Sequence, residues 1–228
     1  MNFLDNIFNK ALYQPLLNAL VFLYQFFPGN DLGIAVIVLT VLVRLFLLPF
    51  TLRALESQKK MTILQKRTKE IQEREKDKEK QLEEIMNLYK EEKVNPFDSI
   101  APILIQLSLL VGLYRVLLRG FGPEALVFLY SFIKPLEINM SFLGLIDLSV
   151  PNLPLAVIAG IMQFVQFKTM PQDKDNKEAT KIMGPMSYFM SIIIFTIVLR
   201  MPSIVGLYIV TTTIFTIGQQ YLLDKKYK

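Results

Sequence analysis

The chain has 228 residues, of which 52% are hydrophobic, and a formal net charge of +5 at neutral pH. Hydrophobic residues gathered in several long runs place it among helical membrane proteins rather than soluble domains. It contains no Cys and no His, so we expect neither disulfides nor Ser-His or Cys-His nucleophile pairs, and we expect no enzyme activity, metal site or cofactor.

The first unit is the N-terminal segment 1–30. It lacks the basic region and small-residue cleavage site of a secretory signal peptide, so we expect it in the mature protein. Its apolar, aromatic part, 10–27, is interrupted by Pro15, Asn18 and Gln25. This pattern favours an interfacial amphipathic helix that lies along the membrane, and a sixth membrane span is the alternative.

The run 31–52, DLGIAVIVLTVLVRLFLLPFTL, predicts the first membrane span, because at ~1.5 Å per residue it crosses a hydrocarbon core of ~30 Å. Arg44 lies about two thirds of the way along it. A cation at that depth costs on the order of 2.5–3.5 kcal/mol unless it reaches the headgroups or faces water. We expect a water-containing cavity, since Arg53 already anchors the end of the span; snorkelling of Arg44 to the cytoplasmic headgroups is the alternative.

Residues 53–98 are densely charged with both signs and predict a long, solvated helical element. We expect it to turn back at the charge run 73–80, EREKDKEK, and to form a cytoplasmic helical hairpin; a single projecting helix is the alternative. The apolar residues of this hairpin that we assign to substrate capture are Met61, Leu64, Ile71, Leu82 and Met86. A coiled coil with a purely structural role is the competing interpretation.

Four more apolar runs complete the chain. We expect further spans at 99–118, 151–167, 182–199 and 203–222, separated by an extracytoplasmic loop at 119–150 and a cytoplasmic loop at 168–181, with a cytoplasmic tail at 223–228. Five spans with the N-terminus outside place most Lys and Arg residues in the cytoplasm, as the positive-inside rule requires. The positive charge therefore reflects membrane topology, and we expect no direct DNA binding.

Polar side chains occur within every predicted span, where they are costly without partners. Each Ser or Thr is a weak signal by itself, because it can bond a carbonyl of its own helix. No Asp or Glu lies in the interior of a span to pair with Arg44. We therefore expect its counter-charge to arrive on a ligand.

Several stretches, in fixed order, resemble the YidC family of membrane protein insertases. They include the arginine-bearing run at 31–52, LYKEEKVNPF at 88–97, AGIMQFVQFKTM at 159–170 and PSIVGLYIVTTTIFTIGQQ at 202–220. The resemblance covers nearly the whole chain and points to the short, Gram-positive-like form without a large extracytoplasmic domain. It implies an all-α membrane protein whose five transmembrane helices surround a hydrophilic groove, open to the cytoplasm and to lipid and sealed outside.

The groove residues that we expect to contact the substrate are Arg44, Gln106, Gln163, Gln166, Tyr208 and Thr211. Three departures from the family pattern stand beside the resemblance. Ser108 replaces a usual proline, and Ile209 and Thr213 replace a tryptophan and an asparagine. A lipoprotein-type signal peptide is also missing, and the short tail argues against a strong ribosome-binding arm.

The resemblance implies a membrane protein insertase and chaperone of the bacterial plasma membrane that works without ATP hydrolysis. We expect nascent membrane proteins with short acidic extracytoplasmic tails as substrates, and the lipid bilayer, the Sec translocon and the ribosome as further partners. A small transporter or channel for an anionic solute is the alternative, although we find no internal repeat to support it. A membrane-tethered scaffold would leave the polar span residues unexplained.

Overall fold

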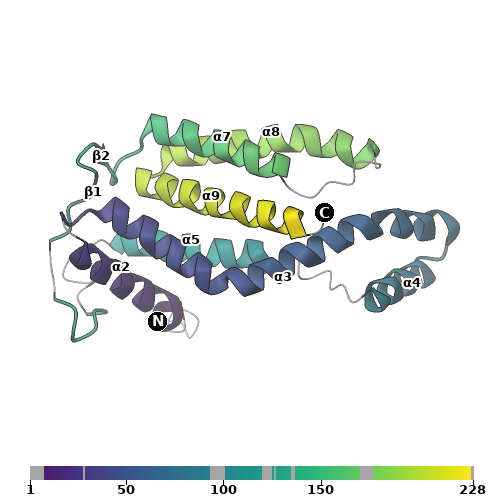
Figure 1. Cartoon of the computed structure of the whole chain (residues 1–228), viewed down its shortest axis with the longest axis horizontal. Helices are drawn as coiled ribbons and strands as arrows, with labels where there is room; N and C mark the ends of the chain where they lie inside the picture. The colour runs from purple at the N-terminus through teal and green to yellow at the C-terminus, as the bar shows by residue number, and fades with distance from the viewer. Residues whose placement is uncertain are drawn as a thin grey trace.

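The computed structural model describes residues 8–27, 29–92, 101–119, 125, 127–134, 137–169 and 177–226. Within these ranges the chain is mostly helical, as expected for an all-α protein. Figure 1 shows α3, α5, α7, α8 and α9 running side by side along the long axis, with α2 beside one end and α4 folded against the far end of α3. The fold is a helical bundle with one projecting arm.

The N-terminal segment forms a short π-helical turn, η1 (Asn9–Tyr13), that continues into α2 (Gln14–Phe26). One face of it is at most 2% exposed, through Tyr13, Leu17, Leu20 and Tyr24. Their spacing of three and four residues places these side chains on one side of a helix. Residues 10–27, predicted as an interfacial helix, are therefore helical with one face packed on the bundle, and α2 runs obliquely beside α3 (Figure 1).

The longest helix, α3 (Leu32–Arg74), runs unbroken through the predicted first span and into the predicted hairpin. Asp31 caps its N-terminus, since its Oδ1 accepts a hydrogen bond from the Ile34 amide at 2.9 Å. The part Leu32–Ser57 is the one helix in the described ranges that is long and apolar enough to cross a membrane, by length and composition. Pro49 lies inside α3 and removes one backbone hydrogen bond, and the helix axis changes direction near its middle (Figure 1).

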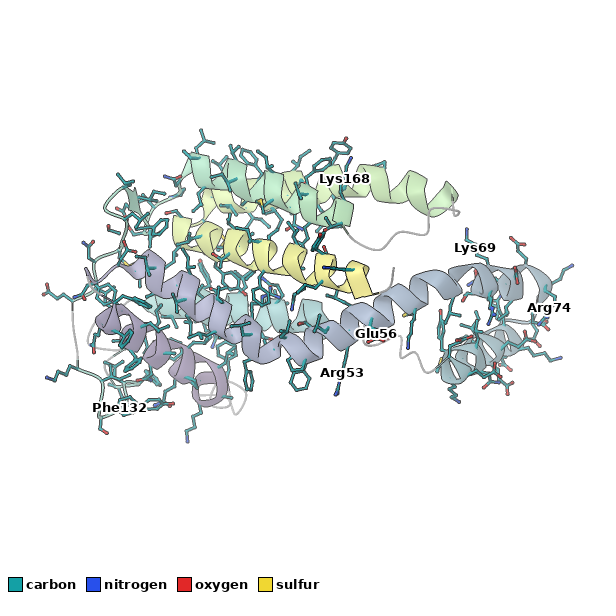
Figure 2. All side chains as sticks on the ribbon, viewed as in Figure 1. Arg53, Glu56, Lys69, Arg74, Phe132 and Lys168 are labelled. Carbon is teal, nitrogen blue, oxygen red and sulfur yellow. The ribbon has the colours of Figure 1, made fainter. Side chains whose placement is uncertain are left out.

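The arm is a pair of antiparallel helices, formed by the end of α3 and by α4 (Lys78–Glu91). The turn between them occupies residues 75–77, inside the charge run at which the sequence predicts it. Two exposed ion pairs join the helices, Arg67 with Glu92 at 3.0 Å and Arg74 with Glu84 at 2.5 Å. Figure 2 shows the Lys69 and Arg74 side chains on this arm, at the opposite end of the molecule from Phe132.

The remaining helices are α5 (Ala101–Arg119), α7 (Leu153–Thr169), α8 (Lys177–Arg200) and α9 (Ser203–Lys226). Figure 1 shows α9 between α7 and α3, and its first residues, 203–209, are all buried. Gly206 lets α9 approach α8 closely, because a Cβ there would lie 2.6 Å from the Val198 side chain. Close packing at this end holds α9 in the centre of the bundle.

A two-stranded hairpin covers the end of the bundle at which α3 and α9 begin. β1 (Ser141–Phe142) pairs antiparallel with β2 (Ile146–Asp147). The Phe142 ring packs on Gly33 so closely that a Cβ at Gly33 would lie 2.2 Å from it. Both strands lie in the segment 119–150, which the sequence predicts as a loop. Two-residue strands are too short to show an alternating pattern, so the sequence does not reveal them.

Polar contacts tie this hairpin to the helix ends. The Oδ2 of Asp31 accepts a hydrogen bond from the Leu143 amide at 2.5 Å, and the Ser203 hydroxyl donates to the Asp147 carbonyl at 2.6 Å. The hydroxyl and the amide of Ser149 both donate to the Asp147 carboxylate. These two hydrogen bonds lower the pKa of the Asp147 carboxyl below its usual range.

The predicted spans overlap the observed helices, but several helix ends differ. Residues 177–181 are helical in α8 although the sequence predicts them as part of a loop, and α9 continues to Lys226 rather than 222. Span prediction counts apolar residues, whereas backbone hydrogen bonding can continue through polar turns. The KVNP motif at 93–96, residues 99–100 of the predicted second span and residues 170–176 of the predicted loop lie outside the described residues.

Candidate functional site

Arg44 lies in the part of α3 that is apolar enough to cross a membrane. The residue is only 9% exposed. Its Nη2 donates a hydrogen bond to Oε1 of Gln106 on α5, whereas its Nε is buried without a hydrogen-bond partner in the described part of the chain. The Arg44 guanidinium stays cationic in proteins, so a buried positive charge is hydrogen-bonded here to a neutral amide.

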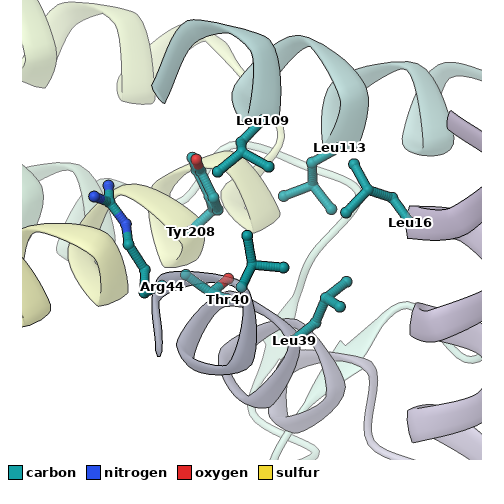
Figure 3. Close-up of a pocket in the computed structure, with 8 residues that line it drawn as sticks. Leu16, Leu39, Thr40, Arg44, Leu109, Leu113 and Tyr208 are labelled. Atoms are coloured by element: carbon teal, nitrogen blue, oxygen red, sulfur yellow. The ribbon is translucent and has the colours of Figure 1, made fainter. Parts of the chain in front are cut away.

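A small pocket adjoins Arg44 between α2, α3, α5 and α9 (Figure 3). Its volume open to water is about 20 Å³, which is room for about one water molecule. It is lined by Leu16, Leu39, Thr40, Val43, Arg44, Leu109, Leu113 and Tyr208. Five of these eight residues are aliphatic and come from α2, α3 and α5, so the pocket is mainly apolar, whereas the sequence predicts a hydrophilic groove.

Two neutral polar residues also line the pocket. Tyr208 on α9 is 4% exposed, and its hydroxyl has no hydrogen-bond partner among the residues that the structure describes. Figure 3 shows its ring beside the Arg44 side chain. Thr40 donates to the Val36 carbonyl of its own helix at 2.6 Å. The pocket therefore presents a guanidinium and a phenol with unused hydrogen-bonding capacity, which water or a ligand can fill.

A second polar cluster joins α3, α9 and α7. The Nε2 of Gln219 donates to the Thr51 hydroxyl at 2.8 Å, and the neighbouring Gln220 accepts a hydrogen bond from Thr169. The Thr169 hydroxyl also lies 2.8 Å from the backbone carbonyl of Gln166. Gln219, Gln220 and Thr51 are each at most 4% exposed. No buried side-chain nitrogen or oxygen of these residues lacks a hydrogen-bond partner, in contrast to the Arg44 pocket.

Comparison with known proteins agrees with the resemblance read from the motifs. The family described as 60Kd inner membrane protein matches residues 22–228. The chain is 33% identical over 207 residues to the membrane protein insertase YidC 2 of Listeria innocua, and 34% identical over 220 residues to the membrane protein insertase YidC of Syntrophus aciditrophicus. The chain belongs to the YidC family. Membership makes it a bacterial membrane protein.

The chain spans only part of these YidC relatives. It covers 66% of the Listeria protein and 37% of the Syntrophus protein, while the matches include 88% and 95% of this chain. The fold is shared with a crystal structure of active YidC insertase in which the first transmembrane domain is resolved, at a TM-score of 0.61 and 24% identity. That match covers 96% of this chain and 46% of the other.

The structure groups some of the expected groove residues and separates others. Arg44, Gln106 and Tyr208 come together around the pocket. Gln163 and Gln166 do not line it; they bond each other on α7, with 3.2 Å between Nε2 and Oε1. The Thr211 hydroxyl donates to the Leu207 carbonyl at 2.8 Å, within its own helix.

The apolar residues expected to capture substrate differ widely in exposure. Leu64 is only 5% exposed, and Met61 and Ile71 are half-buried. Leu82 and Met86 on α4 are 63% and 41% exposed. Only the two α4 residues are therefore available on the surface of the arm in this conformation.

Three residues near these sites are absent from the expected set. Thr51 follows Arg44 by seven residues, which is two helical turns, so this spacing could have identified it. Thr169 ends an apolar run and carries no distinguishing pattern. Leu16 belongs to the N-terminal segment, and periodicity within one helix does not reveal which distant helix it meets.

Proposed function

We propose that this YidC family member inserts nascent membrane proteins into the bacterial plasma membrane and assists their folding. In this proposal Arg44 transiently holds the short acidic tail of the substrate. The observation that carries it is a buried cation that is hydrogen-bonded to a neutral amide and lines a small pocket. A charge attracts a carboxylate more strongly at low effective dielectric constant than in water. The names of the relatives, membrane protein insertases, support the activity.

Insertion of this kind needs no ATP hydrolysis, because burial of the ~20 apolar residues of a substrate helix supplies the free energy. The barrier lies in moving the polar tail through hydrocarbon. Arg44 and Gln106 lower that barrier by offering charge and hydrogen bonds part of the way across. The polar cluster around Gln219 and Thr169 provides further hydrogen-bonding groups along the bundle.

We assign the five spans to α3, α5, α7, α8 and α9, with the N-terminus outside and the C-terminus in the cytoplasm. The excess of Lys and Arg in the arm and the tail supports this orientation. With 17 residues, α7 is about 25 Å long, which is shorter than a ~30 Å hydrocarbon core. A short span of this kind thins the bilayer locally and shortens the path of the tail.

The arm is assigned to substrate capture, and the Sec translocon and the ribosome are candidate partners. The exposed Leu82 and Met86 support this role, because flexible apolar side chains adapt to varied sequences. Deleting residues 69–84 tests it in an insertion assay with purified protein in liposomes. Lower insertion of all substrates is expected; unchanged insertion would assign the arm a purely structural role.

The electrostatic step is tested with paired substrates that carry either an Asp-rich or an Asn-rich tail. Arg44→Ala should reduce insertion of the Asp-tailed substrate at least tenfold and leave the Asn-tailed one unchanged, and Arg44→Lys should retain most activity if a point charge suffices. Arg200→Ala removes an exposed arginine at the end of α8 and is the matched control. Full insertion of the Asp-tailed substrate by Arg44→Ala would remove this step from the proposal.

A further inference from the structure

The hydrogen-bond acceptor of Arg44 is the side-chain amide of Gln106. This amide is chemically similar to the carboxylate that the proposed function assigns to Arg44 as its ligand. Gln106 offers Arg44 an sp² oxygen, as a carboxylate does, but without the negative charge. A guanidinium with this little solvent exposure needs an acceptor when no substrate is present. The neutral amide meets that need within the chain itself.

We propose that Gln106 is a resting-state placeholder for the substrate carboxylate and sets the threshold at which a segment is accepted. This inference rests on the proposed function. In the Arg44–Gln106 hydrogen bond only the donor is ionised, whereas a carboxylate adds the attraction of a full negative charge and can accept two parallel hydrogen bonds from the guanidinium. A carboxylate therefore binds Arg44 with a more favourable free energy than the Gln106 amide does. A neutral tail replaces one neutral acceptor of Arg44 with another, so its binding is not favoured over that of Gln106.

Exchange requires that Gln106 can leave Arg44 without losing all polar contact. Gln106 is half-buried rather than enclosed. It also lies close to the Tyr208 hydroxyl, which has unused hydrogen-bonding capacity. The pocket beside both residues is otherwise mainly aliphatic, so the entering carboxylate meets few competing polar groups apart from Gln106.

The test uses a photoreactive residue in place of Leu109, which lines the pocket, and stalled nascent chains with Asp-rich or Asn-rich tails. Gln106→Leu removes the competing acceptor and should raise crosslinking of both chains by roughly tenfold, the value of one hydrogen bond to a charged group. Gln106→Glu fixes a carboxylate on Arg44. It should lower crosslinking of the Asp-tailed chain to the level of Arg44→Ala.

Thr196→Val on α8 is the control, because it removes an exposed hydroxyl that bonds its own helix. Unchanged or lower crosslinking in a Gln106→Leu variant that unfolds at the wild-type temperature in detergent would overturn the placeholder role. If Arg44→Ala still lowers crosslinking in that case, the proposed function stands without the placeholder. If Arg44→Ala has no effect on the Asp-tailed chain, the electrostatic step itself fails.

Discussion

Two arginines of α3, Arg44 and Arg74, lie in opposite environments. The Arg74 side chain is 71% exposed and pairs with Glu84 on the neighbouring helix, whereas Arg44 is 9% exposed and bonds a neutral amide. An exposed ion pair contributes ~1 kcal/mol or less, because water screens it. A buried cation without a counter-ion among the described residues costs free energy, so its presence marks function better than the two exposed ion pairs of the arm do.

The largest effect should come from replacing Arg44 and its hydrogen-bond partner Gln106 with apolar residues. The double variant Arg44→Met, Gln106→Leu should lose insertion of acidic-tailed substrates and yet unfold at the same temperature as the wild type or higher. Apolar replacement of buried charged groups is often neutral or stabilising by ~1–4 kcal/mol. Thermal unfolding in detergent, measured beside the insertion assay, checks this. A clear loss of stability would mean that the Arg44 contact serves the fold.

The polar cluster should respond in the opposite way, because its members satisfy one another. Gln219→Leu removes the donor to the Thr51 hydroxyl and should lower the free energy of unfolding by about 1 kcal/mol. Thr51→Val and the double variant complete a thermodynamic cycle that isolates the pair. Additive effects of the two substitutions would show that the hydrogen bond contributes nothing.

The arm should show a smaller effect that depends on salt. A cycle of Arg74→Ala and Glu84→Ala should give a coupling free energy of about 0.5 kcal/mol at low ionic strength. At 1 M salt, where the Debye length is about 3 Å, the coupling should largely vanish. Arg67→Ala with Glu92→Ala provides the matched second pair. A coupling that persists at 1 M salt would contradict the assignment of these charges to a solvated surface.

The smallest effect concerns Asp147, which lies on the β2 strand outside the helices. Because hydrogen bonds from Ser149 lower the pKa of its carboxyl in the folded state, its contribution to stability is present above the ordinary carboxyl pKa. That contribution is lost as the pH falls through the lowered pKa. Ser149→Ala should raise the pKa of Asp147, as measured by NMR titration. An unchanged pKa would show that these hydrogen bonds do not act in solution.

Local patterns predicted much of this molecule, and contacts between distant segments did not follow from them. The depth of Arg44 in an apolar run predicted a functional role for it, which stays a prediction, and the family resemblance drawn from the motifs is confirmed by the comparisons. The partner of Arg44 could not be predicted, because Gln106, Gln163 and Gln166 are equivalent as sequence signals. Only the packing of α5 against α3 assigns the contact to Gln106.

The continuity of α3 has a mechanical consequence. Pro49 separates a segment of five residues that ends at Arg44 from one of twenty-five residues that ends at Arg74. At ~1.5 Å per residue, the segment that ends at Arg44 is about 8 Å long and the segment that ends at Arg74 is about 38 Å long. If the helix pivots at the missing hydrogen bond of Pro49, a sideways displacement of several ångströms at the Arg74 end moves the Arg44 guanidinium by about one fifth as much. In the membrane topology proposed above, such leverage would convert a large movement of the arm into a small adjustment of the Arg44 side chain.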